Sequence, residues 1–237
     1  DPGFSSLIFS IVVFGFVGGI TGVTIGTEQI NIIVHNTLRS PGHFHATVVS
    51  GTAMAFMGTT YYLIPLVFRK KVALWGFARI QPYLFAGGML VFTIFMTFAG
   101  SFGVPRRHWD ISFSQAPFDV QFDPIVDLLL AVMAMGGLVA ATAALGFVAI
   151  AVKSVFFGEP LGTITEGVEM RGVPHGLTHP PRHAANVDEL NAALHAPGRG
   201  FLGPAPGTLV TVFIFLAAFM LYFFVNWKVL SFVWKIG

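Results

Sequence analysis

Two histidines, His43 and His45, are separated by one phenylalanine within a stretch of small and apolar residues. In an α-helix, two positions of separation turn the side chain by ~200° about the helix axis. The two imidazoles therefore point to opposite sides of one helix and cannot share a metal ion, as a zinc-binding pair four residues apart would. Two flat cofactors flanking the helix fit this arrangement, because heme iron takes axial histidine and the macrocycle fills an apolar gap between helices.

Pro41 precedes this pair and is favoured in the first turn of a helix, so both histidines should be helical and close to the membrane surface. Polar groups inside a membrane are costly and are usually functional or paired. The alternative for a single buried histidine is a structural hydrogen bond. Two imidazoles that face opposite ways need two separate partners, which favours the cofactors.

Adjacent arginines, Arg106 and Arg107, lie in a later turn between two apolar segments. Guanidinium groups match carboxylates with two parallel hydrogen bonds, so this pair suits the propionates of a heme. Lipid headgroups are the alternative partners. His35 and Asn36 lie in the loop before the histidine helix and could complete a polar cap over the same propionates, with ordinary loop hydrogen bonding as the alternative.

The composition indicates an integral membrane protein. Of 237 residues, 54% are hydrophobic and 10% are charged, whereas about 25% are charged in an average soluble domain. The absence of Cys excludes disulfides, iron–sulfur clusters and thiolate metal sites, so a metal must use His, carboxylate or a prebuilt cofactor. The net charge of +2 comes from basic residues in loops, which set membrane topology, and implies no nucleic acid partner.

The fold class predicted from the sequence is all-α, with about five membrane-spanning helices, each long enough to cross ~30 Å of hydrocarbon. They are expected near residues 4–25, 43–68, 80–100, 124–157 and 208–234. Small residues recur inside them, as at Gly18-Gly19 and Gly136-Gly137, which suits close helix packing. We expect heme-binding helices over 1–157, an irregular cytoplasmic loop over 158–207 and a C-terminal spanning helix over 208–237.

Loop charge predicts the orientation, because cytoplasmic loops accumulate Lys and Arg. The side expected to be cytoplasmic carries Arg69, Lys70, Lys71, Arg79, Lys153, Arg171, Arg182 and Arg199, and the outer side carries Arg39, Arg106, Arg107, Lys228 and Lys235. The arginine pair at the outer side runs against this bias, which suggests that something anionic holds it there.

The loop over 158–207 is rich in Pro, Gly and His. His175, His179 and His183 recur at four-residue intervals, a pattern that could bind a metal if it were helical. Pro174 and Pro180 interrupt such a helix, so solvated loop histidines are the preferred interpretation.

The sequence resembles subunit I of the heme-copper oxidases, specifically the B-type branch. The resemblance covers the whole chain, is weak in the His-rich loop, and corresponds to the last five of about thirteen helices of one larger bundle. The order, spacing and outer-side placement of three motifs carry it: His35-Asn36-Thr37, Pro41-Gly42-His43-Phe44-His45 and Gly103-Val104-Pro105-Arg106-Arg107.

The resemblance implies a role for each of these residues. His43 would be the proximal ligand of the high-spin heme in the active site, and His45 an axial ligand of the low-spin heme. Arg106 and Arg107 would hold the propionates. His35 and Asn36 would lie beside them, near the exit route for protons and water.

Two departures from the family are visible. The A-type branch has an Asp at the position of Asn36, where it helps to bind magnesium, and Arg39 stands where relatives commonly have an aromatic residue. The family's copper ligands and the second axial His of the low-spin heme come from earlier helices and are not in this sequence. We therefore interpret the chain as one part of a longer polypeptide or as a split subunit.

The resemblance implies reduction of dioxygen to water in a multi-pass protein of a prokaryotic inner membrane, coupled to proton translocation. The expected partners are the remainder of subunit I, a subunit II-like copper-carrying subunit, cytochrome c or quinol as electron donor, and lipid. The expected cofactors are two hemes and an active-site copper bound from outside this chain. The alternatives are a nitric oxide reductase-like member of the superfamily, a non-catalytic diheme membrane cytochrome and an inert structural subunit.

Overall fold

The computed structural model describes residues 1–108, 110–114, 116–118, 120–179 and 187–195, together with isolated residues between 210 and 228. Apart from two isolated backbone bridges, all regular structure in these parts of the chain is helical. Residues Asp1–Leu194 form one compact unit, and His195–Gly237 form a second. The predicted all-α fold class is confirmed for the described residues.

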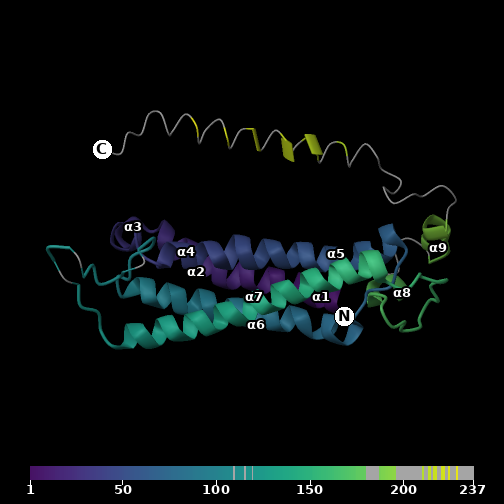
Figure 1. Cartoon of the computed structure of the whole chain (residues 1–237), viewed down its shortest axis with the longest axis horizontal. Helices are drawn as coiled ribbons and strands as arrows, with labels where there is room; N and C mark the ends of the chain where they lie inside the picture. Colours follow the sequence, from purple (N-terminus) through teal and green to yellow (C-terminus); the bar gives the residue numbers. More distant parts are fainter. Residues whose placement is uncertain are drawn as a thin grey trace. The chain divides into compact units, whose positions relative to one another are not determined.

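Four helical stretches of the first unit are long and apolar enough to cross a membrane (Figure 1). The first contains α1 (Pro2–Val12), the π-helix η1 (Val13–Gly18) and α2 (Gly19–Gly26). The second contains α4 (Arg39–Phe44), the π-helix η2 (His45–Thr52) and α5 (Ala53–Phe68). The third is α6 (Trp75–Ser101), and the fourth is α7 (Ile125–Phe157). The fifth predicted span, 208–234, lies almost entirely outside the described residues.

Three shorter helices lie between or after these spans: α3 (Glu28–Val34), α8 (His175–Thr178) and α9 (Val187–His195). The segment between the first two spans, expected as a loop, thus contains α3 and the start of α4. Helix α8 follows Pro174 and ends before Pro180, and the rings of His175 and His179 stack with centroids 4.0 Å apart. His183 lies outside the described residues, among which no group of three side chains could hold a metal ion.

Helices α6 and α7 lie side by side and pack through glycine. A Cβ added to Gly88 would lie 2.6 Å from the backbone nitrogen of Ala140, and one added to Gly136 would lie 2.8 Å from that of Phe92. The two backbones therefore touch where side chains would separate them, as the small residues predicted. The π-helices η1 and η2 also lie in contact, with Gly18 against the side chain of Thr47.

A buried polar contact joins α5, α6 and α7. The Tyr61 hydroxyl donates to Oε1 of Gln81 (3.0 Å), and Nε2 of Gln81 donates to the carbonyl of Ala143 (3.3 Å). Tyr61 and Gln81 are both fully buried. In a membrane helix bundle such interhelical hydrogen bonds help to fix which helices pair.

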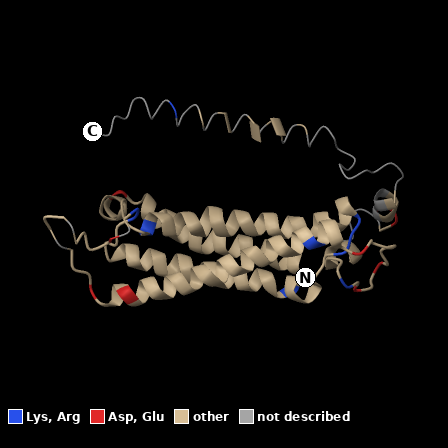
Figure 2. Cartoon of the chain, viewed as in Figure 1, with Lys and Arg blue, Asp and Glu red and all other residues tan. Residues whose placement is uncertain are grey.

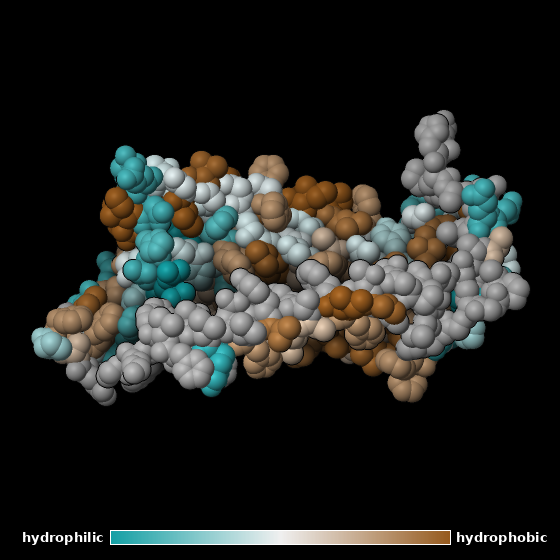
Figure 3. Space-filling view, turned by 90° about the horizontal axis from the view of Figure 1, so that it is seen from above, coloured by the Kyte–Doolittle hydropathy of each residue, from teal (hydrophilic) through white to brown (hydrophobic). Residues whose placement is uncertain are grey.

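Charged residues gather at the two ends of the helices, and the middle of the helices is free of them (Figure 2). We call the end with Asn36, Arg106 and Arg107 the Arg106 end, and the end with Lys71 and Lys153 the Lys71 end. Large apolar side chains between these ends are exposed in this chain, and Figure 3 shows hydrophobic residues along the helices with hydrophilic residues near the ends. Such a surface requires lipid or further apolar helices around it.

Candidate cofactor-binding site

The helix that carries both histidines begins at Arg39 and has Pro41 in its first turn. Proline has its φ angle preset for a helix and lacks the N–H that would be unpaired there. His43 consequently lies in α4, and His45 is the first residue of η2. The span starts four residues before the predicted position because the loop residues Arg39 to Gly42 are themselves helical.

The His43 imidazole faces α2. Its Nδ1 lies 3.0 Å from Oγ1 of Thr21, and the Thr21 hydroxyl in turn lies 2.5 Å from the carbonyl oxygen of Val17. Because the hydroxyl has one proton and donates it to Val17, Thr21 accepts from the Nδ1–H of His43. Gly22 permits this approach, since a Cβ there would lie 3.0 Å from Cε1 of His43. The arrangement favours the tautomer that has an unprotonated Nε2, the form that can bind a metal.

The His45 imidazole faces α6 instead. Its Nδ1–H donates to the carbonyl oxygen of Pro41 (2.7 Å), and its ring meets Phe92 edge to face with centroids 5.2 Å apart. This hydrogen bond leaves Nε2 unprotonated in the neutral ring, and so able to bind a metal. The two imidazoles thus lie against different helices, as the ~200° turn between them requires. Metal binding by either histidine stays a prediction.

The wider turns of η2 begin at His45. The Ser50 hydroxyl donates to the His45 carbonyl (2.7 Å), and the Thr47 hydroxyl donates to the His43 carbonyl (3.1 Å). These side chains satisfy carbonyl oxygens where the helix leaves α geometry. π-Helical segments inside α-helices occur frequently at functional sites.

Backbone pairing brings the arginine turn to the histidine helix. Thr37 and Pro105 form an isolated antiparallel bridge, and the Leu38 amide donates to the Val104 carbonyl (2.9 Å). The Arg106 amide donates to the Asn36 carbonyl (2.9 Å). The Arg106 guanidinium also donates to Oδ1 of Asn36 (3.2 Å), so residues far apart in sequence form one structure.

A pocket of about 540 Å³ lies under this turn. It is lined by Leu38, Ser40, Pro41, His43, Phe44, Arg106 and Arg107. The structure therefore brings three of the predicted site residues, His43, Arg106 and Arg107, to one pocket. His45 is not among the residues that line it.

The Nε atom of Arg106 is buried and has no hydrogen-bond partner among the described residues. A buried charged donor without a hydrogen bond destabilises the fold by several times the free energy that a surface contact contributes. We therefore expect an anionic partner for this group. The apolar pocket wall, a histidine with a free Nε2 and an unpaired guanidinium N–H fit a heme with its carboxylates. The residues present therefore fit the cofactor that the sequence predicts.

His35 is not brought to this pocket. It is exposed, and its Nδ1 lies 3.1 Å from the side-chain oxygen of Asn31 on α3. Asn36 is exposed too, and it reaches the site only through Arg106. The predicted role of His35 in a polar cap therefore has no direct contact to support it in this chain.

Two residues outside the predicted site contact it: Thr21, which the sequence analysis did not name, and Arg39, which it named only as a departure from the family. Thr21 orients His43. Arg39 donates to Oγ of Ser101 (2.7 Å) and to Oγ1 of Thr24 (3.2 Å), which ties α2, α4 and α6 together one turn above His43. The threonines of α2 alternate with glycine in an otherwise apolar helix, and that is the one signal that could have identified them.

Comparisons with known proteins show which family the chain belongs to. Residues 4–156 match the family described as Cytochrome C and Quinol oxidase polypeptide I. Cytochrome c oxidase subunit 1 of Thermus thermophilus is 31% identical over 112 residues, which cover 45% of this chain and 19% of that protein. Cytochrome c oxidase subunit 1 of a Synechocystis species is 30% identical over 160 residues, covering 65% of this chain and 26% of that protein.

Part of a solved structure of a heme-copper terminal oxidase dimer has a fold similar to that of this chain. The TM-score is 0.59 at 25% sequence identity, and the match covers 81% of this chain and 33% of the other. The chain thus corresponds to a third or less of each of these proteins. The likeness includes the helices that carry His43, His45, Arg106 and Arg107, since all four lie within the residues matched by the family.

Proposed function

Since the chain belongs to the Cytochrome C and Quinol oxidase polypeptide I family, we propose that it is the C-terminal, heme-ligating part of the catalytic subunit of a terminal oxidase. The reaction is the reduction of dioxygen to water, with electrons from cytochrome c or quinol and with proton translocation. The observation that carries the proposal is that His43, Arg106 and Arg107 line one pocket, where a buried N–H of Arg106 has no partner among the described residues.

Each side chain has a defined task in this proposal. His43, held in orientation by Thr21, would offer Nε2 to the iron of the high-spin heme. His45, held by the Pro41 carbonyl, would offer Nε2 to the low-spin heme. The two hemes would supply the electron-transfer chemistry, and copper would be bound by residues outside this chain. Arg106 and Arg107 would neutralise the propionates.

The polar residues at the Arg106 end would position these groups and exchange protons with water. Asn36 holds Arg106 in place through its side-chain oxygen. His35 is exposed beside it, in contact with solvent. Asn36 supplies no carboxylate, so the structure offers no reason to place magnesium at this position.

The wider assembly follows from family membership. Subunit I functions with other oxidase subunits, and we propose a subunit II-like copper-carrying partner and the remainder of subunit I around the exposed apolar faces of this chain. The B-type branch is favoured by the motifs around His43 and Arg106. We propose a prokaryotic inner membrane as the location of the chain. The concentration of Lys and Arg at the Lys71 end favours placing that end at the cytoplasm.

The test compares His43→Ala and His45→Ala with His108→Ala in the purified membrane complex. His108 is an exposed histidine near the same end of the chain and does not line the pocket. The His43 variant should lose the carbon-monoxide-reactive heme, the His45 variant should lose the six-coordinate heme, and the control should keep both. Normal reduced-minus-oxidised spectra in both variants would refute the assignment.

Metal analysis of the same complex separates the alternatives. Two hemes with copper and carbon monoxide binding support an oxidase. Iron in place of copper supports a nitric oxide reductase-like enzyme. A complex without any carbon-monoxide-reactive heme is a diheme cytochrome or a structural subunit, and it would end the oxidase proposal.

A further inference from the structure

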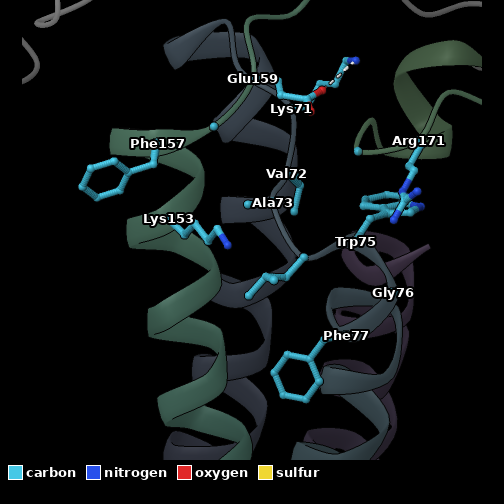
Figure 4. Close-up of a pocket in the computed structure, with 13 residues that line it drawn as sticks. Lys71, Val72, Ala73, Trp75, Gly76, Phe77, Lys153, Phe157, Glu159 and Arg171 are labelled. Atoms are coloured by element: carbon cyan, nitrogen blue, oxygen red, sulfur yellow. Dashed lines mark hydrogen bonds and ion pairs between the residues drawn. The ribbon is translucent and has the colours of Figure 1, made fainter.

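A second, larger pocket lies at the Lys71 end, away from both histidines. Its volume is about 780 Å³, and it lies between the beginning of α6, the end of α7 and the segment around Arg171 (Figure 4). Helices α6 and α7 are both long and apolar enough to cross a membrane, which would put a pocket at their ends at the depth of lipid headgroups.

The walls of this pocket are held by hydrogen bonds within the chain. The Val72 amide donates to the Gly172 carbonyl (2.7 Å), and the Ala73 amide donates to Oγ of Ser154 (2.8 Å). The pocket is therefore built into the fold of 71–77, the end of α7 and the segment around Gly172. A binder would meet a preformed site and would not have to order a loop.

Three cationic side chains and one acidic side chain line the pocket: Lys71, Lys153, Arg171 and Glu159. Lys71 is paired with Glu159, with Nζ and Oε2 3.2 Å apart. Lys153 and Arg171 make no hydrogen bond or ion pair with any residue that the structure describes, and Figure 4 shows the Lys153 side chain extending from α7 toward the segment before Trp75. Two positive charges are thus left for an outside anion.

The first turn of α6 adds backbone donors to these charges. The helix starts at Trp75 without a side-chain cap, and no described residue accepts from the amides of Trp75, Gly76 or Phe77. A Cβ added to Gly76 would meet nothing within 4 Å, so the space beside these amides is open. The free amides and the positive end of a helix dipole bind phosphate groups well.

The remaining surface of the pocket is aromatic and apolar. Trp75, Phe77 and Phe157 line it, and the last two are exposed in the chain. Aromatic residues concentrate at the boundary between hydrocarbon and headgroups. The pocket therefore has a cationic part that suits an anion and an apolar part that suits acyl chains. A free inorganic anion would contact only the cationic part.

We propose that this pocket binds the headgroup of an anionic phospholipid, with the phosphate at the start of α6 between Lys153 and Arg171 and the acyl chains along Phe77 and Phe157. The proposal is independent of the hemes, because none of these residues contacts His43 or His45. Lipid bound here would tie the α6–α7 pair to the segment around Arg171.

The test measures lipid binding to the purified, delipidated membrane complex by native mass spectrometry and by the shift in thermal unfolding. Phosphatidylglycerol should bind and raise the unfolding temperature more than phosphatidylcholine. Lys153→Gln should bind phosphatidylglycerol about tenfold more weakly, because it loses a charge-assisted hydrogen bond. Arg69→Gln removes the same charge from a neighbouring turn, does not alter the pocket lining, and should bind as the unsubstituted protein does.

A second variant keeps all charges. Gly76→Leu should block the phosphate position, while the open space beside Gly76 lets the helix form normally. Equal binding of the two lipids, or unchanged binding in both pocket variants, would overturn the proposal. If inorganic phosphate alone produces the full thermal shift, the site takes a free anion and the lipid assignment is wrong.

Discussion

Arg106 donates two hydrogen bonds to Asn36, one from its backbone amide to the Asn36 carbonyl (2.9 Å) and one from its guanidinium to Oδ1 (3.2 Å). Both residues lie outside the spanning helices, yet this contact sets where the arginine pair stands relative to His43. The backbone pairing of Leu38 with Val104 continues the same contact toward the helix. The cation is therefore positioned by the chain before any cofactor binds, which lowers the cost of binding.

Replacing Asn36 tests this positioning. Asn36→Leu removes the side-chain acceptor of Arg106 and should destabilise the complex by about 1 kcal/mol, the usual net value of such a hydrogen bond. It should also lower the midpoint potential of the heme at His43, because a misplaced guanidinium neutralises less propionate charge. Redox titration and thermal unfolding measure these effects. Asn36→Asp keeps an oxygen acceptor, and an equal loss in both variants would contradict the role of the hydrogen bond.

Replacing Thr21 tests the orientation of His43. Thr21→Val preserves the side-chain shape but removes the oxygen that accepts from Nδ1–H, so the imidazole should become a weaker donor to iron. Resonance Raman spectroscopy should show a changed iron–histidine stretching frequency and redox titration a changed potential, while the heme content is retained. Thr21→Ser restores the acceptor and should restore both values. An unchanged frequency in the valine variant would show that Thr21 does not orient the ligand.

The contact between α6 and α7 predicts a sharp difference between two adjacent glycines. Gly88→Val should destabilise the complex by about 1–3 kcal/mol or more, because the added atoms meet backbone, which cannot move aside. Gly87→Val is the matched control, since a Cβ at Gly87 meets nothing within 4 Å. Thermal unfolding of both variants measures the difference. Equal stability would show that the two helices are farther apart than described.

Acid should loosen the loop at the Arg106 end. Hydrogen bonds from the hydroxyl and amide groups of Ser114 and Ser112 hold the pKa of Asp110 below its usual value. Because the pKa of Asp110 is lower in the folded protein, its ionised carboxylate stabilises the fold at pH values above the unfolded-state pKa of ~3.9. This stabilisation is lost as the pH falls through the lower folded-state pKa. Hydrogen exchange of the 110–114 segment, corrected for intrinsic rates, should therefore stay slow at neutral pH and accelerate in strong acid.

The matched variant is Asp110→Asn, which cannot titrate. Its exchange should be faster at neutral pH, because a neutral amide accepts these hydrogen bonds less strongly. It should also show no further change in acid. A titration of the same size in the asparagine variant would assign the effect to another group.

The periodicity and hydropathy of the sequence were enough to predict the fold class and four of the spans. They were enough because a membrane helix must pair its own backbone hydrogen-bonding groups and must be apolar over its whole length. The opposite orientation of His43 and His45 also follows from helix geometry alone. The start of the second span was predicted four residues late, because Arg39 and Ser40 look like loop residues and their helical state depends on contacts with Ser101 and His35.

The contacts that complete the site could not be derived from local sequence. Thr21 reaches His43 across two helices, and Arg106 reaches Asn36 across a separation of 70 positions. Which residues meet across such distances depends on how α2, α4 and α6 pack. The two pockets were invisible for the same reason, since each is lined by segments that are distant in sequence.

The π-helix η2 has a consequence for comparing this protein with others. A π turn takes up one more residue than an α turn, so everything after Thr52 is rotated relative to the direction that an unbroken α-helix from His43 would give. A relative without this wider turn must lack one residue between His45 and Thr52 to present the same face of α5. An alignment gap placed there preserves the pairing of Tyr61 with Gln81, whereas an ungapped alignment displaces it by one position.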